Sequence, residues 1–159
     1  MSVRRSFVSL MALLLCVSGV LVAEEAAKVD FSKIKCPISK KAVSESAVAE
    51  YGDAKSKVYF CCDNCVAAFK KDSKKFETKA NHQLVLTKQV KQVGCPMSGK
   101  EVDASTAIKV ADAEVAFCCS NCQAAAKKKS EDEQIAFIFG EKNFKKAFKL
   151  VKETEDKVK

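Results

Sequence analysis

The sequence predicts an α+β protein made of two copies of one small unit, followed by a C-terminal amphipathic helix. Three observations support this prediction. Eight cysteines fall into two sets of four with matching spacing, each set encloses a strand–turn–strand pattern, and a helical pattern begins inside each cysteine cluster. The 159 residues suffice for one ordinary domain or two very small ones. Because 48% of them are hydrophobic, the chain is not expected to be disordered throughout.

The eight cysteines form an internal repeat. The first set is Cys36, Cys61, Cys62 and Cys65, and the second is Cys95, Cys118, Cys119 and Cys122. Matching members are separated by 59, 57, 57 and 57 residues, and Cys-Pro-Ile-Ser in the first set matches Cys-Pro-Met-Ser in the second. The sequence therefore predicts one repeat over residues 30–79, a connector over residues 80–92 and a second repeat over residues 93–140.

Each repeat is expected to contain a hairpin. Residues 47–51 and 57–61 flank a Gly-Asp turn, and residues 106–110 and 114–118 flank a similar short turn. The Cys-Pro-x-Ser motif that precedes each hairpin predicts a tight turn, because proline fixes φ and serine bonds to the local backbone.

A helix is predicted to follow each hairpin. Asp63 and Ser120 are suitable N-caps, and Ser120 with Gln123 has the pattern of a capping box. Val66, Phe69 and Phe76 place an apolar stripe on the first helix.

Two further segments carry apolar patterns. In the connector, residues 84–86 fit either a strand or a buried helical turn. In residues 141–159, Phe144, Ala147, Phe148 and Val151 have helical spacing and predict the C-terminal amphipathic helix.

The first 23 residues have the three parts of a secretory signal. Arg4 and Arg5 supply a positive region, residues 7–22 form an apolar run, and Ala23 is a small residue at the expected cleavage point. The run has 16 residues, fewer than the ~20 that span a bilayer. We therefore expect residues 1–23 to be a cleaved signal peptide, the protein to be exported to the periplasm or secreted, and the mature chain to have no membrane span.

Small units of this size need a staple, either disulfides or metal. Export favours disulfides, and so does the even number of cysteines, eight, that remain once Cys16 is removed with the predicted signal. The candidate pairs are Cys36–Cys61 or Cys36–Cys65. The spacing favours metal, because adjacent Cys61 and Cys62 rarely bridge each other and thiolates are stabilised at a helix N-terminus. We expect all eight cysteines of the two sets to bind metal, Zn²⁺ first and Cu⁺ as the alternative. A disulfide-stapled or thiol-redox interaction protein without metal is the alternative function.

These motifs resemble the YHS/TRASH-type heavy-metal-binding domains, which are related to the zinc finger of ribosomal protein L24e. The two-copy layout behind a signal resembles a group of exported planctomycete proteins. The resemblance covers about residues 33–77 and 92–130. It implies treble-clef or zinc-ribbon-like ββα units and a role in metal trafficking, sensing or resistance. It implies metal-binding cysteines at Cys36, Cys61, Cys65, Cys95, Cys118 and Cys122.

One departure from the family pattern affects the fourth ligand. The second cysteine of the family's knuckle is Ser39 or Ser98 in this chain, and a neutral hydroxyl binds zinc poorly. Cys62 and Cys119 are the obvious substitutes, and the alternative is that they are buried small hydrophobes or redox-labile thiols. A site with three thiolates would keep an open position, which suits metal transfer or trigonal Cu⁺.

Other functions have less support. Lysine clusters could contact phosphates, but the only arginines, Arg4 and Arg5, lie in the predicted signal, so no specific nucleic acid is expected as a partner. The lone His82 has no copy in the second repeat and is not expected to bind metal. The expected partners are a metal ion and an unknown metal-accepting protein.

No enzymatic activity is expected. The chain has no Gly-rich phosphate loop and no repeated nucleophile–His–acid set. Thiol–disulfide exchange at Cys62–Cys65 or Cys119–Cys122, which have Cys-x-x-Cys spacing, is the catalytic alternative, although a thioredoxin-like frame is missing.

Overall fold

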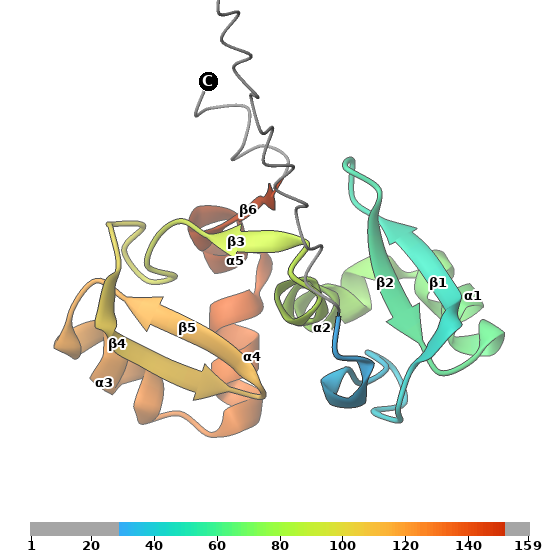
Figure 1. Ribbon diagram of the computed structural model, residues 1–159, viewed down its shortest axis with the longest axis horizontal. Coiled ribbons are helices and arrows are strands. Elements are labelled where there is room, and N and C mark those ends of the chain that lie inside the picture. Colours follow the sequence, from blue (N-terminus) through green and yellow to red (C-terminus); the bar gives the residue numbers. More distant parts are fainter. Residues whose placement is uncertain (1–28, 152–159) are drawn as a thin grey trace, which may run out of the picture.

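Five α-helices, one short 3₁₀-helix and three two-stranded antiparallel sheets make up residues 29–151, the part of the chain that the computed structural model describes (Figure 1). The predicted α+β class is confirmed. The predicted signal peptide, residues 1–23, lies outside the described residues. Within residues 29–151, no helix combines the length and the apolar character needed to cross a membrane.

The elements follow one another in this order: η1 Phe31–Lys33, β1 Ser44–Tyr51, β2 Ser56–Phe60, α1 Asp63–Lys71, α2 Ser73–Leu86, β3 Val90–Gln92, β4 Asp103–Val110, β5 Ala113–Phe117, α3 Ser120–Lys127, α4 Glu131–Phe139, α5 Glu141–Ala147 and β6 Phe148–Leu150.

Both predicted hairpins are present. β1 pairs with β2, and β4 pairs with β5. In β2, Val58 and Phe60 are fully buried and alternate with more exposed residues, and Val115 and Phe117 do the same in β5. Period-two alternation places these side chains on one face of each hairpin, toward the helices that follow. Each long first strand also has an irregular register near its start.

The helices begin where the sequence predicts, but the capping prediction is wrong by one residue. Cys62 is the N-cap of α1 and Cys119 is the N-cap of α3, both with extended backbone and no side-chain cap bond. Gln123 does not complete a capping box, because its Nε2 donates to the carbonyl of Thr106 at 3.0 Å. The capping box that does form joins Ser130 and Glu133 at the start of α4.

The predicted first helix is two helices. α1 ends at Lys71, and the carboxylate of Asp72 accepts from the backbone N–H of Lys75 at 3.2 Å and so caps α2. Of the two alternatives for residues 84–86, the helical one is found, since they form the last turn of α2. Residues 80–92 thus contain the second half of α2 and all of β3.

The predicted C-terminal helix, residues 141–159, is interrupted by a strand, and its last part, residues 152–159, lies outside the described residues. α5 stops at Ala147, and Phe148–Leu150 form β6, which pairs antiparallel with β3. Helical spacing in the sequence correctly marked Ala147 and Phe148 as buried. It could not reveal that a free strand edge at Val90–Gln92 would pair with this segment, so the prediction of a helix through Val151 is wrong for β6.

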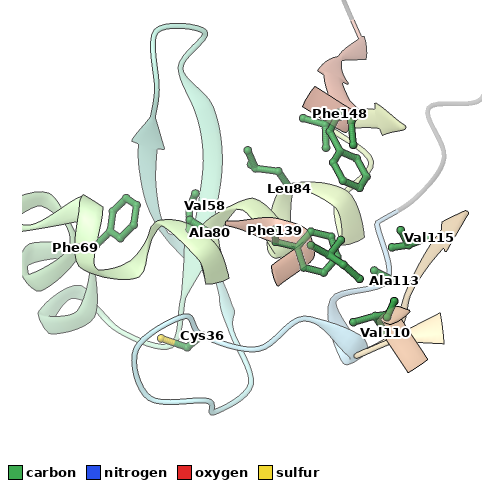
Figure 2. Packing of buried hydrophobic residues seen from close by; sticks show 14 of the residues in the cluster. Cys36, Val58, Phe69, Ala80, Leu84, Val110, Ala113, Val115, Phe139 and Phe148 are labelled. Atoms are coloured by element: carbon green, nitrogen blue, oxygen red, sulfur yellow. The ribbon is translucent and has the colours of Figure 1, made fainter. Parts of the chain in front are cut away.

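One continuous core joins the two repeats. It includes Val58 and Phe69 of the first repeat, Val115 and Phe139 of the second, and Ala80 of α2 (Figure 2). Helix α2 packs against α4 and α5 as well as against β2. In Figure 1 α2 lies between the two hairpins.

Polar contacts reinforce the junction of the two repeats. The buried Asn81 donates its Nδ2 to the carbonyl of Phe139 at 3.0 Å, which fixes α2 against the end of α4. The Nε2 of His82 lies 2.9 Å from the carbonyl of Ala111 in the β4–β5 turn. Because a carbonyl can only accept, His82 donates from Nε2 in this contact.

Candidate metal centres

The structure brings together three cysteines in each repeat. The Sγ atoms of Cys36, Cys61 and Cys65 lie within 4.8 Å of one another, and those of Cys95, Cys118 and Cys122 do the same. In both sets the first cysteine comes from the turn before the hairpin, the second follows the second strand, and the third lies in the first turn of the helix. We call these two groups the inner triads.

The sulfur spacing fits a bound ion. The Cys61–Cys65 and Cys118–Cys122 Sγ–Sγ distances are both 3.7 Å. Thiolates that share a tetrahedral zinc ion at about 2.3 Å lie about 3.8 Å apart. The two inner triads are therefore close enough to hold a metal ion, with little further movement between these sulfur atoms.

The first cysteine of each triad lies in a tight knuckle. The N–H of Cys36 donates to the carbonyl of Lys41 at 2.8 Å, and the N–H of Lys40 donates back to the carbonyl of Cys36 at 3.0 Å. Cys95 repeats this pattern with Lys100 at 2.8 Å and Gly99 at 2.7 Å. Cys36 is 1% exposed and Cys95 is fully buried. The Cys-Pro-x-Ser prediction of a tight turn is confirmed.

The knuckle stabilises a thiolate at its cysteine. Burial acts to raise the pKa of Cys36, but hydrogen bonds from the side chain and backbone of Ser39 and from the backbone of Cys61 outweigh it and lower the pKa to about 7. At Cys95, burial is again opposed by hydrogen bonds, from the backbone and side chain of Ser98 and the backbone of Cys118, and the pKa falls to about 6. Thiolates are the form in which cysteine binds metal.

The third cysteine of each triad behaves in the opposite way. Burial, together with hydrogen bonds to neighbouring thiols, raises the pKa of Cys65 and of Cys122. The knuckle cysteine therefore ionises at a lower pH than the helix cysteine, which retains its proton more strongly. A bound cation would displace that proton, so binding at these sites releases protons and weakens as pH falls.

The serine of each Cys-Pro-x-Ser turn contacts the triad. Ser39 Oγ lies 3.1 Å from Cys61 Sγ, and Ser98 Oγ lies 3.2 Å from Cys118 Sγ, each within hydrogen-bonding distance. Each hydroxyl also accepts from a backbone N–H, that of Lys41 or that of Lys100. These two serines link the knuckle to the thiols. Their bonds to the local backbone follow from the motif, whereas their contacts with Cys61 and Cys118 could not be predicted from local sequence.

The fourth cysteine of each set lies at the edge of the triad. Cys62 Sγ is 3.7 Å from Cys61 and 3.8 Å from Cys65, and Cys119 Sγ is 3.9 Å from Cys118. Neither is part of the mutually close set that includes the knuckle cysteine. Because Cys62 is exposed and Cys119 is half-buried, neither is a buried small hydrophobe, so that part of the alternative is wrong, and the redox-labile reading stays a prediction.

The eight described cysteines are all free thiols, so the structure contains neither of the disulfide pairs considered above for Cys36. His82 belongs to neither triad. It contacts Phe139 with a ring-centroid distance of 4.8 Å, and burial lowers its pKa.

Comparisons with protein-family models, with curated proteins and with solved structures find no match, so the geometry of the two cysteine clusters carries the functional argument.

Proposed function

We propose that the protein is an exported metal-binding protein that holds one soft or borderline ion, zinc or copper, in each repeat. The observation that carries the proposal is the duplication of the inner triad, with the same 3.7 Å separation between strand-end and helix cysteines in both copies. Thiolate sulfur prefers Zn²⁺ and Cu⁺ over hard cations such as Mg²⁺ or Ca²⁺. A role in metal trafficking, sensing or resistance, rather than catalysis, follows from the same donor set and from the YHS/TRASH resemblance.

The number of thiols in each inner triad bears on the choice of ion. Cu⁺ is satisfied by three thiolates, whereas a structural zinc site takes four ligands. Zinc at Cys36, Cys61 and Cys65 would need a fourth donor, which Cys62, a water molecule or a partner could supply. A site of three thiolates plus an exchangeable position suits an ion that is handed on.

Elemental mass spectrometry tests this proposal directly. The mature protein would be purified from its native compartment without added metal, and its free thiols would be counted after denaturation in chelator. We expect two metal ions per chain and eight reduced thiols, because each triad needs its three cysteines as thiolates and the remaining two, Cys62 and Cys119, are free thiols in the structure.

The same sample gives the contrary answer if the proposal is wrong. Protein without metal and with most thiols oxidised would mean that the repeats are a disulfide scaffold or a thiol-redox protein. One metal ion per chain instead of two would mean that only one of the two triads is a binding site.

A further inference from the structure

The first repeat contains a second set of three close thiols that overlaps the inner triad. The Sγ–Sγ distances are 3.7 Å for Cys61–Cys62, 3.7 Å for Cys61–Cys65 and 3.8 Å for Cys62–Cys65. We call this set the outer triad. Three sulfurs bound to one ion at about 2.3 Å lie about 3.8 to 4.0 Å apart, depending on whether the ion is tetrahedral or trigonal. The outer triad is therefore spaced for the same ion as the inner one.

The two triads differ in exposure. The inner one is completed by Cys36, which is 1% exposed and enclosed by its knuckle, whereas the outer one is completed by Cys62, which is exposed. Cys61 and Cys65, which are half-buried, belong to both. An ion would thus pass from a buried to an accessible position by exchanging a single ligand, Cys36 for Cys62.

Helix stability does not explain a cysteine at this position. Cys62 is the N-cap of α1, where Ser, Thr, Asp or Asn would each accept a hydrogen bond from the helix, yet its side chain makes no such bond. Cys119 has the same place in α3, with φ −169° and ψ 166° against −167° and 166° for Cys62, and it also makes no cap bond. A cysteine thus occupies the N-cap in both repeats, although its thiol caps neither helix.

From these observations we propose that Cys62 is the exchange ligand through which the metal leaves the first site for an acceptor, and that Cys119 has this role in the second. The proposal rests on the proposed function, since it requires that the clusters bind metal. Cys36 and Cys95 would retain the ion, and the thiols at the edge of each inner triad, the exposed Cys62 and the half-buried Cys119, would present it. The acceptor is a molecule that offers its own thiolate or another soft donor.

The exchange is balanced without any oxidant or reductant. The Cys62 thiol loses its proton to solvent as its sulfur bonds to the ion, and the bond to Cys36 breaks. The acceptor's donors then bond to the ion while the bonds to Cys61, Cys65 and finally Cys62 break, and these three sulfurs take up protons from solvent. The ion keeps its oxidation state throughout, as expected for Cu⁺ passed between thiolates.

The test uses the full mature chain loaded with Cu⁺ without oxygen, and bicinchoninate, a chelator whose Cu⁺ complex absorbs visible light, as the acceptor. The double variant Cys62→Ser/Cys119→Ser is compared with the unchanged chain. Serine is close in size and is a preferred N-cap, so the metal-free variant should melt no lower than the unchanged chain. We expect the double variant to retain two copper ions. Its rate of copper transfer to bicinchoninate should fall about tenfold, because no thiol at the edge of the triad is then positioned to hold the ion while the acceptor binds it.

Two results would overturn the inference and leave the proposed function in place. Loss of copper from the double variant would make Cys62 and Cys119 holding ligands of closed four-thiolate sites. Full copper content with an unchanged transfer rate would make them bystanders. If the unchanged chain itself bound no Cu⁺ or Zn²⁺, the proposed function would fail first, and the inference with it.

Discussion

Gln83 holds both backbone hydrogen-bonding groups of Tyr59. Its Oε1 accepts from the Tyr59 N–H at 2.6 Å, and its Nε2 donates to the Tyr59 carbonyl at 2.9 Å and to the Lys35 carbonyl at 3.2 Å. The buried amide thus takes the place of a neighbouring strand on the open edge of β2. Lys35 immediately precedes Cys36, and Tyr59 lies two residues before Cys61, so one side chain positions two arms of the first inner triad.

Removing the Gln83 amide is expected to destabilise the protein. Gln83→Met keeps the side-chain length but leaves backbone groups of Tyr59 and Lys35 without partners, which should lower the free energy of unfolding by about 2 to 4 kcal/mol. Metal affinity of the first site should fall as well, while that of the second is kept. Urea unfolding and metal titration would measure these effects.

Gln89 provides a matched control, because its partner Lys57 lies in β2 two residues before Tyr59. Gln89 makes the same pair of bonds to Lys57, both at 2.7 Å, but near the surface. Gln89→Met should cost less than Gln83→Met, because water replaces the lost bonds of exposed groups. Equal losses for the two variants would contradict the strand-replacing role of the buried amide.

The two knuckles differ at their left-handed residue. Lys40 has φ 60° in the first, and Gly99 has φ 75° in the second. A residue with a Cβ is strained in this region by about 1 to 2 kcal/mol. We expect Lys40→Gly to raise the free energy of unfolding by about 0.5 to 1 kcal/mol, since the exposed ion pair of Lys40 with Asp132 contributes little.

The converse substitution completes the comparison. In Gly99→Ala the new Cβ would also lie 3.0 Å from Cγ of Lys146, whose Nζ donates to the Met97 carbonyl. This variant should lose about 1 to 2 kcal/mol in thermal or urea unfolding. Effects of the same sign in both variants would rule out backbone strain as the cause.

His82 should make stability depend on pH. Burial lowers its pKa below the ordinary value of 6.5, against the weaker opposing effects of the Ala111 and Val110 carbonyls and of Asp112 and Glu131. The unfolded chain therefore takes up the proton at higher pH than the folded chain does. Stability is complete above about pH 6.5 and should fall as pH decreases through the lowered folded pKa.

His82→Gln isolates this effect. Glutamine keeps an N–H donor for the Ala111 carbonyl but does not titrate. Metal-free protein would be unfolded in urea at several values between about pH 7 and pH 5. The free energy of unfolding of the unchanged chain should decrease more steeply toward acid than that of the variant, and parallel curves would show that His82 does not titrate in this range.

Each inner triad should be removable on its own. Cys65→Ser and Cys122→Ser each delete one ligand of one triad, so each variant should bind one metal ion instead of two. Since both repeats contribute to one core, each loaded variant should unfold in a single transition rather than in two steps. The melting temperature of that transition should be lower than in the unchanged chain. Calorimetry with elemental analysis checks both points, and two retained ions in either variant would contradict the ligand assignment.

The repeat could be read from the sequence because its causes are local. Strands 56–60 and 113–117 alternate between buried and exposed side chains, and the Cys-Pro-x-Ser turns follow from proline geometry and serine hydrogen bonding. Close approach of Cys61 and Cys65 follows from the short connection between the second strand and the helix, since Cys61 directly precedes the N-cap and Cys65 lies in the first turn. The α+β class and most of each inner triad were therefore determined by short-range patterns.

Other features depend on contacts between distant segments. The change from helix to strand at Phe148 requires the free edge of Val90–Gln92, 56 or more residues earlier in the chain. Such outcomes are decided by the packing energy of the whole core, which no window of sequence contains.

By itself, the sequence determined that two cysteine clusters would form, each between a hairpin and a helix. Only the tertiary structure decided how each cluster is divided, with Cys36 and Cys95 buried in their knuckles and Cys62 exposed at the start of α1. The physical reason is that spacing along a chain sets which thiols can meet. Burial of a thiol is set by the segments that fold over it, and those segments, including α2 and its buried Gln83, come from elsewhere in the sequence.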